Sequence, residues 1–157
     1  MTREEQFMAQ AIELSQKAIL NNEGGPFGCI VVKGNEVVGR GNNKVTSSND
    51  PTAHAEVVAI RDACHNLKTF QLTDCEIYTS CEPCPMCLGA IYWARPSKIY
   101  YANTRHDAAE SGFDDSVIYE EIKADPDKRK IPMIHLKSNK AQSIFEEWNS
   151  KADKTAY

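Results

Sequence analysis

Residues 76–96 read EIYTSCEPCPMCLGAIYWARP, and this stretch decides the fold. Its first part, Glu76 to Thr79, predicts a strand because β-branched and aromatic side chains dominate it. Cys84 to Ala94 predicts a helix, which Arg95-Pro96 ends because proline cannot continue a helix. Three cysteines lie around the point where the strand gives way to the helix. The pattern therefore predicts a strand that leads directly into a cysteine-bearing helix start.

The flanking segments extend this alternation of strands and helices in both directions. Thr2 and Glu5 have the spacing of a capping box, which predicts the start of a first helix. The other predicted elements are strands at 29–32, 37–39, 99–102 and 133–136, helices at 53–66 and 141–150, and a polar loop at 42–51. Strands that alternate with helices of ten or more residues imply an α/β fold with an at least partly parallel sheet.

Length, composition and charge narrow the class of protein. The chain has 157 residues, 41% of them hydrophobic, so we expect one domain over residues 1–157. No signal peptide and no membrane span are expected, so the six cysteines are interpreted as thiols or metal ligands in a cytoplasmic protein. The net charge of −4 argues against a nucleic-acid partner, since such proteins usually have a basic surplus.

Two short motifs supply the side chains for a metal site: His54-Ala55-Glu56 and Pro83-Cys84-Pro85-Met86-Cys87. Two cysteines three residues apart on a helix share a face, so both sulfurs can reach one ion. Zinc suits two thiolates and one imidazole, and three protein ligands leave a fourth position open for water. We therefore predict a catalytic zinc site formed by His54, Cys84 and Cys87.

The spacing of His54 and Glu56 raises an objection, because residues two apart on a helix do not face each other. The objection disappears if the ion lies above a helix start, and the start signals Asp50-Pro51-Thr52 support this. Pro83 is likewise expected at the first position of the second helix. Glu56 would then stand beside the reactive water, take its proton and deliver protons to the ring nitrogen and to the departing ammonia.

These motifs also admit other interpretations. A lone Cys-x-x-Cys is often a structural zinc site or a redox pair, and Cys81 forms a second such spacing with Cys84. Because Glu82 precedes a proline and should be extended, Cys81 is expected near the site but not on the metal. The remaining cysteines and histidines lack partner motifs and are expected in the core or on the surface: Cys29, Cys64, Cys75, His65, His106 and His135.

Residues 49–56 (NDPTAHAE) and 79–91 (TSCEPCPMCLGAI) resemble the cytidine deaminase superfamily, and the resemblance covers nearly the whole chain. The branch that includes bacterial guanine deaminases and transfer-RNA adenosine deaminases is the most similar. Four further segments resemble the bacterial guanine deaminases: GGPFG at 24–28, YWARP at 92–96, AAESGFDDS at 108–116, and the terminal Tyr157.

The resemblance implies a three-layer fold with a mixed five-stranded sheet flanked by helices, and one Zn²⁺ per chain. It also implies a homodimer in which residues 137–157 are exchanged, so that each tail closes the partner's site. The implied reaction is hydrolysis of guanine to xanthine and ammonia. The implied substrate contacts are Asn43 and Asp115 at the purine edges, Phe27 against the ring, Trp93 along the pocket, Tyr157 as its cover, and Ala55.

Alternatives remain at several of these positions. Asp115 can instead cap the following helix, Trp93 can be core packing, and a terminal tyrosine is usually disordered. Three functions compete: guanine deamination, deamination of adenosine in transfer RNA, and a non-catalytic zinc module. Cytosine or another small heterocycle is a further possible substrate. The acidic charge and the closing tail favour a free purine base over transfer RNA.

Overall fold

The strand predicted first, β3 (Cys75–Cys81), lies inside a four-stranded mixed sheet. The computed structural model describes residues 1–157 as two compact units, Met1–Asp115 and Ser116–Tyr157, and each is described by itself. The sheet belongs to the first unit and has the order β2-β1-β3-β4. Its other strands are β1 (Gly28–Lys33), β2 (Glu36–Asn42) and β4 (Lys98–Asn103). β1 is antiparallel to both neighbours, whereas β3 and β4 are parallel.

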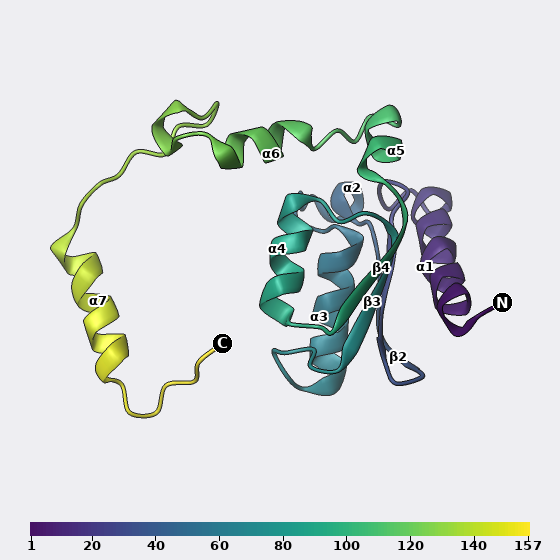
Figure 1. Cartoon of the computed structure of the whole chain (residues 1–157), viewed down its shortest axis with the longest axis horizontal. Helices are drawn as coiled ribbons and strands as arrows, with labels where there is room; N and C mark the ends of the chain where they lie inside the picture. The colour runs from purple at the N-terminus through teal and green to yellow at the C-terminus, as the bar shows by residue number, and fades with distance from the viewer. The chain divides into compact units, whose positions relative to one another are not determined.

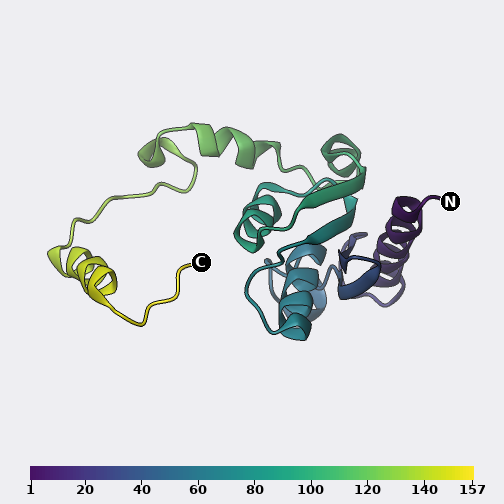
Figure 2. The same ribbon diagram turned by 60° about the horizontal axis from the view of Figure 1, so that its bottom comes forward.

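Helices cover both faces of this sheet, as Figures 1 and 2 show. α1 (Arg3–Leu20) lies on one face, and α3 (Ala55–Leu67) and α4 (Pro85–Ala94) lie on the other. The predicted capping box at Thr2 is present. Side chains alternate along β3, so Ile77 packs in the cluster beneath α3 and α4, while Tyr78 packs with Phe7 of α1. The three predicted layers are therefore confirmed.

Two glycines allow α3 to lie directly on β2. A Cβ at Gly41 would come 2.3 Å from the carbonyl oxygen of Ala55, and one at Gly39 would come 2.6 Å from that of Ala59. Both contacts are too short for any side chain. Because the contact at Gly41 involves the first turn of α3, it fixes the height at which that helix begins over the sheet.

The remaining elements are short or lie in the second unit. α2 (Val45–Ser48) occupies part of the predicted polar loop, and α5 (Arg105–Glu110) follows β4. The second unit comprises α6 (Ser116–Lys123), the 3-10 turn η1 (Pro126–Lys128) and α7 (Asn139–Ser150), which confirms the helix predicted at 141–150. Neither α6 nor α7 has a buried residue. No helix of the chain is long and apolar enough to cross a membrane.

The predicted fifth strand is wrong. Residues 133–136 have no regular secondary structure, and Met133 and Leu136 are 59% and 84% exposed. Their apolar sequence suits a strand, but a strand exists only where a neighbour supplies hydrogen bonds, and the sheet ends at β4. The sheet therefore has four strands.

Candidate metal centre

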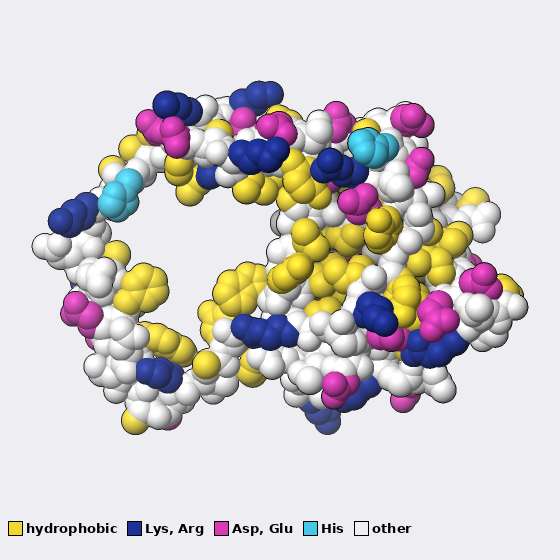
Figure 3. All heavy atoms as spheres, viewed as in Figure 1, with side chains coloured by type: hydrophobic (Ala, Val, Ile, Leu, Met, Phe, Trp, Pro, Cys, Tyr) yellow, Lys and Arg dark blue, Asp and Glu magenta, His cyan; other side chains and the backbone are white.

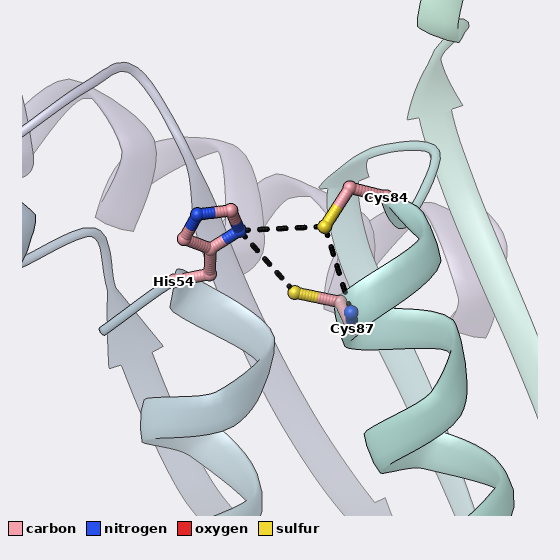
Figure 4. A group of neighbouring side chains, drawn as sticks. All are labelled: His54, Cys84 and Cys87. Atoms are coloured by element: carbon pink, nitrogen blue, oxygen red, sulfur yellow. Dashed lines mark hydrogen bonds between the residues drawn. The ribbon is translucent and has the colours of Figure 1, made fainter. Parts of the chain in front are cut away.

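His54, Cys84 and Cys87 point toward one another from the starts of two helices (Figure 4). Nδ1 of His54 lies 3.5 Å from Sγ of Cys84 and 3.4 Å from Sγ of Cys87, and the three ligand atoms all lie within 4.8 Å of one another. Tetrahedral coordination with ordinary Zn–S and Zn–N bonds separates nitrogen from sulfur by about 3.6 Å. The three side chains therefore fit a single zinc ion.

Both halves of this centre stand at helix N-caps. His54 caps α3 and Cys84 caps α4, and each has an extended backbone, with ψ of 155° and 168°. Because an N-cap residue has a non-helical backbone, its side chain does not follow the helical spacing of the residues after it. His54 and Glu56 can therefore both lie near the metal although they are only two residues apart. Pro85, not the expected Pro83, occupies the first helical position, because α4 begins one residue after Cys84. The positive ends of both helices favour anionic sulfur here.

The pKa values of the Cys84 and Cys87 thiols favour a bound cation. Hydrogen bonds from Cys87 and then from His54 lower the pKa of Cys84 to about 4, so its sulfur is readily anionic. The hydrogen bond to that sulfur, together with burial, raises the pKa of Cys87. Two adjacent sulfurs thus resist simultaneous ionisation, and a divalent cation removes that resistance.

Glu56 is buried next to the centre without belonging to the ligand group. It lies in the first turn of α3, is 6% exposed, and receives a hydrogen bond on Oε1 from the Thr79 hydroxyl at 3.2 Å. Burial raises the pKa of Glu56. A raised pKa lies closer to neutral pH, where the carboxyl group can both accept and release a proton.

Asn43 follows β2 and is 6% exposed. Its Oδ1 accepts hydrogen bonds from the backbone N–H groups of Gly25, at 3.2 Å, and Val45, at 3.1 Å. A Cβ on Gly24 would come 2.0 Å from that oxygen, so the side chain has room only because residue 24 is glycine. The oxygen is therefore already engaged, and only the amide nitrogen remains to donate to a ligand.

Phe27 and Asp115 both belong to the first unit but are far apart in its sequence. The Phe27 ring meets the ring of Phe113 edge to face, with centroids 4.9 Å apart. Burial, followed by the negative charge of the Cys84 sulfur, raises the pKa of Asp115. The substrate contact predicted for Asp115 stays a prediction. Phe113 is a contact that sequence reasoning did not assign.

The other predicted site residues are placed as follows. Ala55 begins α3 and is fully buried between His54 and Glu56. Trp93 is 64% exposed, and the helical rise puts it about 13 Å along α4 from Cys84. Tyr157 is 73% exposed and belongs to the second unit. The substrate contacts assigned to these residues stay predictions.

Cys81 lies where it was expected. It ends β3, is 5% exposed, and its Sγ lies 3.6 Å from the carbonyl oxygen of Thr104, outside the metal-ligand group. Sequence reasoning missed its neighbour Thr79, which contacts Glu56. The available signal was a polar residue at an inward-facing position of an apolar strand.

The sequence that forms this centre matches a known family of metalloproteins. Residues 1–103 match the family model of the cytidine and deoxycytidylate deaminase zinc-binding region. The chain belongs to this family.

Among its relatives within that family, the chain is 51% identical to the guanine deaminase of Bacillus subtilis over 153 residues, 98% of each chain. The X-ray structure of that enzyme gives a TM-score of 0.95, again with 98% of each chain covered.

Three other relatives match less of the chain. A tRNA-specific adenosine deaminase of Aquifex aeolicus is 37% identical over 111 residues, covering 69% of this chain and 73% of the relative. The structure of a guanine deaminase from Nitrosomonas europaea is 32% identical with a TM-score of 0.66, covering 69% of this chain and 63% of that one. Another tRNA-specific adenosine deaminase, of Buchnera aphidicola, is 33% identical over 138 residues, covering 88% of this chain and 81% of the relative. These relatives are thus less similar to the chain than the Bacillus subtilis enzyme is.

Proposed function

We propose that the chain hydrolyses guanine to xanthine and ammonia with one zinc ion per chain. The observation that carries the proposal is the 51% identity to a guanine deaminase over 98% of both chains, which extends through the C-terminal unit. Two transfer-RNA deaminases are only 37% and 33% identical, over 69% and 88% of this chain, and the net charge of −4 does not favour a polyanion. The second candidate, deamination of adenosine in transfer RNA, is therefore less well supported.

Glu56 is the proton carrier in this mechanism. When bound, zinc acts as a Lewis acid that makes water a better nucleophile near neutral pH. The Glu56 carboxylate takes a proton from the attacking water as the new C–O bond forms at C2, and passes it to the adjacent ring nitrogen. It then moves the second water proton to the amino group. The C2–N bond breaks, ammonia leaves and xanthine remains, so atoms and charge balance.

Asn43, Phe27 and Asp115 would hold the purine. Because Oδ1 of Asn43 is engaged by two backbone N–H groups, Asn43 can offer only its NH₂ group, which suits an acceptor such as N7 or O6 of guanine. Asp115 can accept from a ring N–H, and Phe27 offers an apolar face to the ring. Ala55 would contact the ring beside the metal, and Trp93 would line the outer pocket.

A substrate panel tests the proposed function directly. We expect the zinc-loaded protein to release ammonia from guanine, and to release far less from adenine, cytosine, cytidine and a transfer-RNA anticodon stem. Release is measured with an ammonia-coupled assay, and xanthine is identified by chromatography. An inert guanine sample beside a reactive anticodon stem would replace this proposal with the transfer-RNA one.

We further propose a homodimer in which residues 137–157 cover the partner's site with Tyr157. The second unit supports this because its helices bury nothing of their own: Ile144, Phe145 and Trp148 of α7 are 50%, 68% and 40% exposed. Hydrophobic side chains also gather over α4 and β4 of the first unit (Figure 3). Apolar surfaces of this kind are typical of protein interfaces.

Removal of residues 152–157 should lower kcat/KM for guanine by about tenfold or more, because the site would stay open to water. A Thr155→Ala variant, which keeps the tail, serves as the control. A mixed dimer distinguishes exchange from folding back. A truncated subunit paired with a Glu56→Gln subunit regains activity only if the intact tail closes the truncated subunit's site. Unchanged kinetics of the truncated protein would contradict the covering role.

A further inference from the structure

Thr79 forms a buried contact with the proposed proton carrier. It lies in β3, is 1% exposed, and places its hydroxyl oxygen 3.2 Å from Oε1 of Glu56 and 3.1 Å from the carbonyl oxygen of Cys81. Its neighbours in the strand face the other way, since Tyr78 packs against α1. The only polar side chain that the middle of β3 directs toward α3 thus meets the Glu56 carboxyl group.

Stability of the strand does not require this second contact. A buried hydroxyl needs one acceptor for its single proton, and the Cys81 carbonyl oxygen, 3.1 Å away, would satisfy that need without Glu56. The contact with Glu56 is therefore additional to what the threonine needs for itself. It adds a fixed contact to one oxygen of the Glu56 carboxyl group.

A hydroxyl is suited to both protonation states of a carboxyl group. It has one proton and can also accept a hydrogen bond. When Glu56 is ionised, Thr79 donates to Oε1. When a proton resides on Oε1, the carboxyl group can donate to Thr79, whose own proton then turns to the Cys81 carbonyl oxygen. In both arrangements the Thr79 hydroxyl and Oε1 of Glu56 stay hydrogen-bonded to each other, so the contact can persist while the proton moves.

We propose that Thr79 is a positioning residue for Glu56: it holds Oε1 against β3 and leaves Oε2 to exchange protons with water and substrate. This inference rests on the proposed role of Glu56. It assigns to Thr79 no contact with substrate or metal. Misplacement of a catalytic group by about 1 Å can reduce a rate by about 100-fold, so a loose carboxyl group should slow the chemical steps.

Three substitutions at Thr79 test the proposal with kcat and KM for guanine. Thr79→Val keeps the shape and removes the hydroxyl, so we expect kcat to fall about 10- to 100-fold with KM within about twofold. Zinc content and melting temperature should stay close to those of the native protein. Thr79→Ser should restore most of kcat. Thr79→Ala differs from the serine variant by the hydroxyl alone, which preserves the comparison if valine prevents folding.

The adjacent residue supplies a matched control. The Tyr78 hydroxyl also donates to a carboxylate, Oε2 of Glu76 at 3.2 Å, but on the opposite face of the sheet. Tyr78→Phe removes the same kind of contact from the same strand, and it should leave kcat within about twofold. An equal loss of kcat in this variant would make the effect a general one of the strand, and would overturn the proposal.

The Glu56→Gln background separates this inference from the proposed function. If Thr79 acts through Glu56, Thr79→Val should not further lower the residual rate of Glu56→Gln, measured at high enzyme concentration. An additional loss there, or loss of zinc in the valine and alanine variants, would overturn the positioning role. Normal kcat in Thr79→Val beside an inactive Glu56→Gln would overturn this inference alone, whereas an active Glu56→Gln would overturn the proposed mechanism itself.

Discussion

Glu56→Gln should keep zinc at one ion per chain and lower kcat for guanine by about 10²- to 10⁴-fold. Glutamine has the size and shape of glutamate, but its amide cannot take a proton from water or return one to the leaving amino group. Glu56 lies outside the metal-ligand group, so its replacement removes no ligand. Burial of Glu56 also favours the substitution structurally, since a neutral amide costs less to bury than a charge.

Zinc is measured by metal analysis and turnover by xanthine formation in the same preparation. Glu36→Gln, at the exposed start of β2, makes the same chemical change away from the centre and should retain full activity. Full activity in Glu56→Gln would mean that another group moves the protons. Loss of zinc in that variant would mean that the glutamate supports the metal.

The metal centre could be predicted from sequence because metal chemistry constrains it locally. The cysteine spacing, the prolines and the paired start signals each restrict the backbone near the ligands. Together they predicted that the ion lies above two helix starts, and the N-cap positions of His54 and Cys84 have that arrangement. The first helical position of α4 was predicted at Pro83 and lies two residues later, at Pro85, since both prolines suit that position.

Features that depend on contacts between distant segments could not be predicted. The sequence suggests Asn43 as a polar group, but only the folded loop of Gly24 and Gly25 shows that its oxygen is engaged. Strand alternation could place Thr79 on the inward face, yet it does not name Glu56 as the neighbour. Residues 133–136 failed as a strand for the same reason, because pairing depends on a partner segment and not on local composition.

Cys87→Ser should abolish zinc binding and, with it, turnover. Cys87 is fully buried, and its Sγ lies 3.4 Å from Nδ1 of His54 as one of the three grouped ligand atoms. A serine hydroxyl is a harder and far less acidic donor than a thiol, and it does not form the thiolate that zinc prefers. The variant should also melt at a lower temperature in the presence of zinc, because ligand binding to the native state alone stabilises it.

Chelation and acidification are two independent ways to remove zinc from the native protein. Stripping zinc from the native protein should abolish activity, and adding zinc back should restore it in the native protein but not in Cys87→Ser. Protons compete with the metal for thiolates and imidazole, so zinc affinity should fall as pH falls. Because the adjacent thiols of Cys84 and Cys87 resist simultaneous ionisation, zinc binding must release a proton from this pair.

Cys81→Ala is the matched control, because it removes a buried sulfur three residues before Cys84 that lies outside the ligand group. It should keep one zinc per chain and most of the activity. Comparison of Cys87→Ser with Cys81→Ala tests which cysteines bind the zinc, and not only whether cysteines are needed. If Cys81→Ala lost zinc while Cys87→Ser retained it, the ion would be held by the other Cys-x-x-Cys spacing. The position of the zinc-bound water, and with it the role of Glu56, would then have to be reassigned.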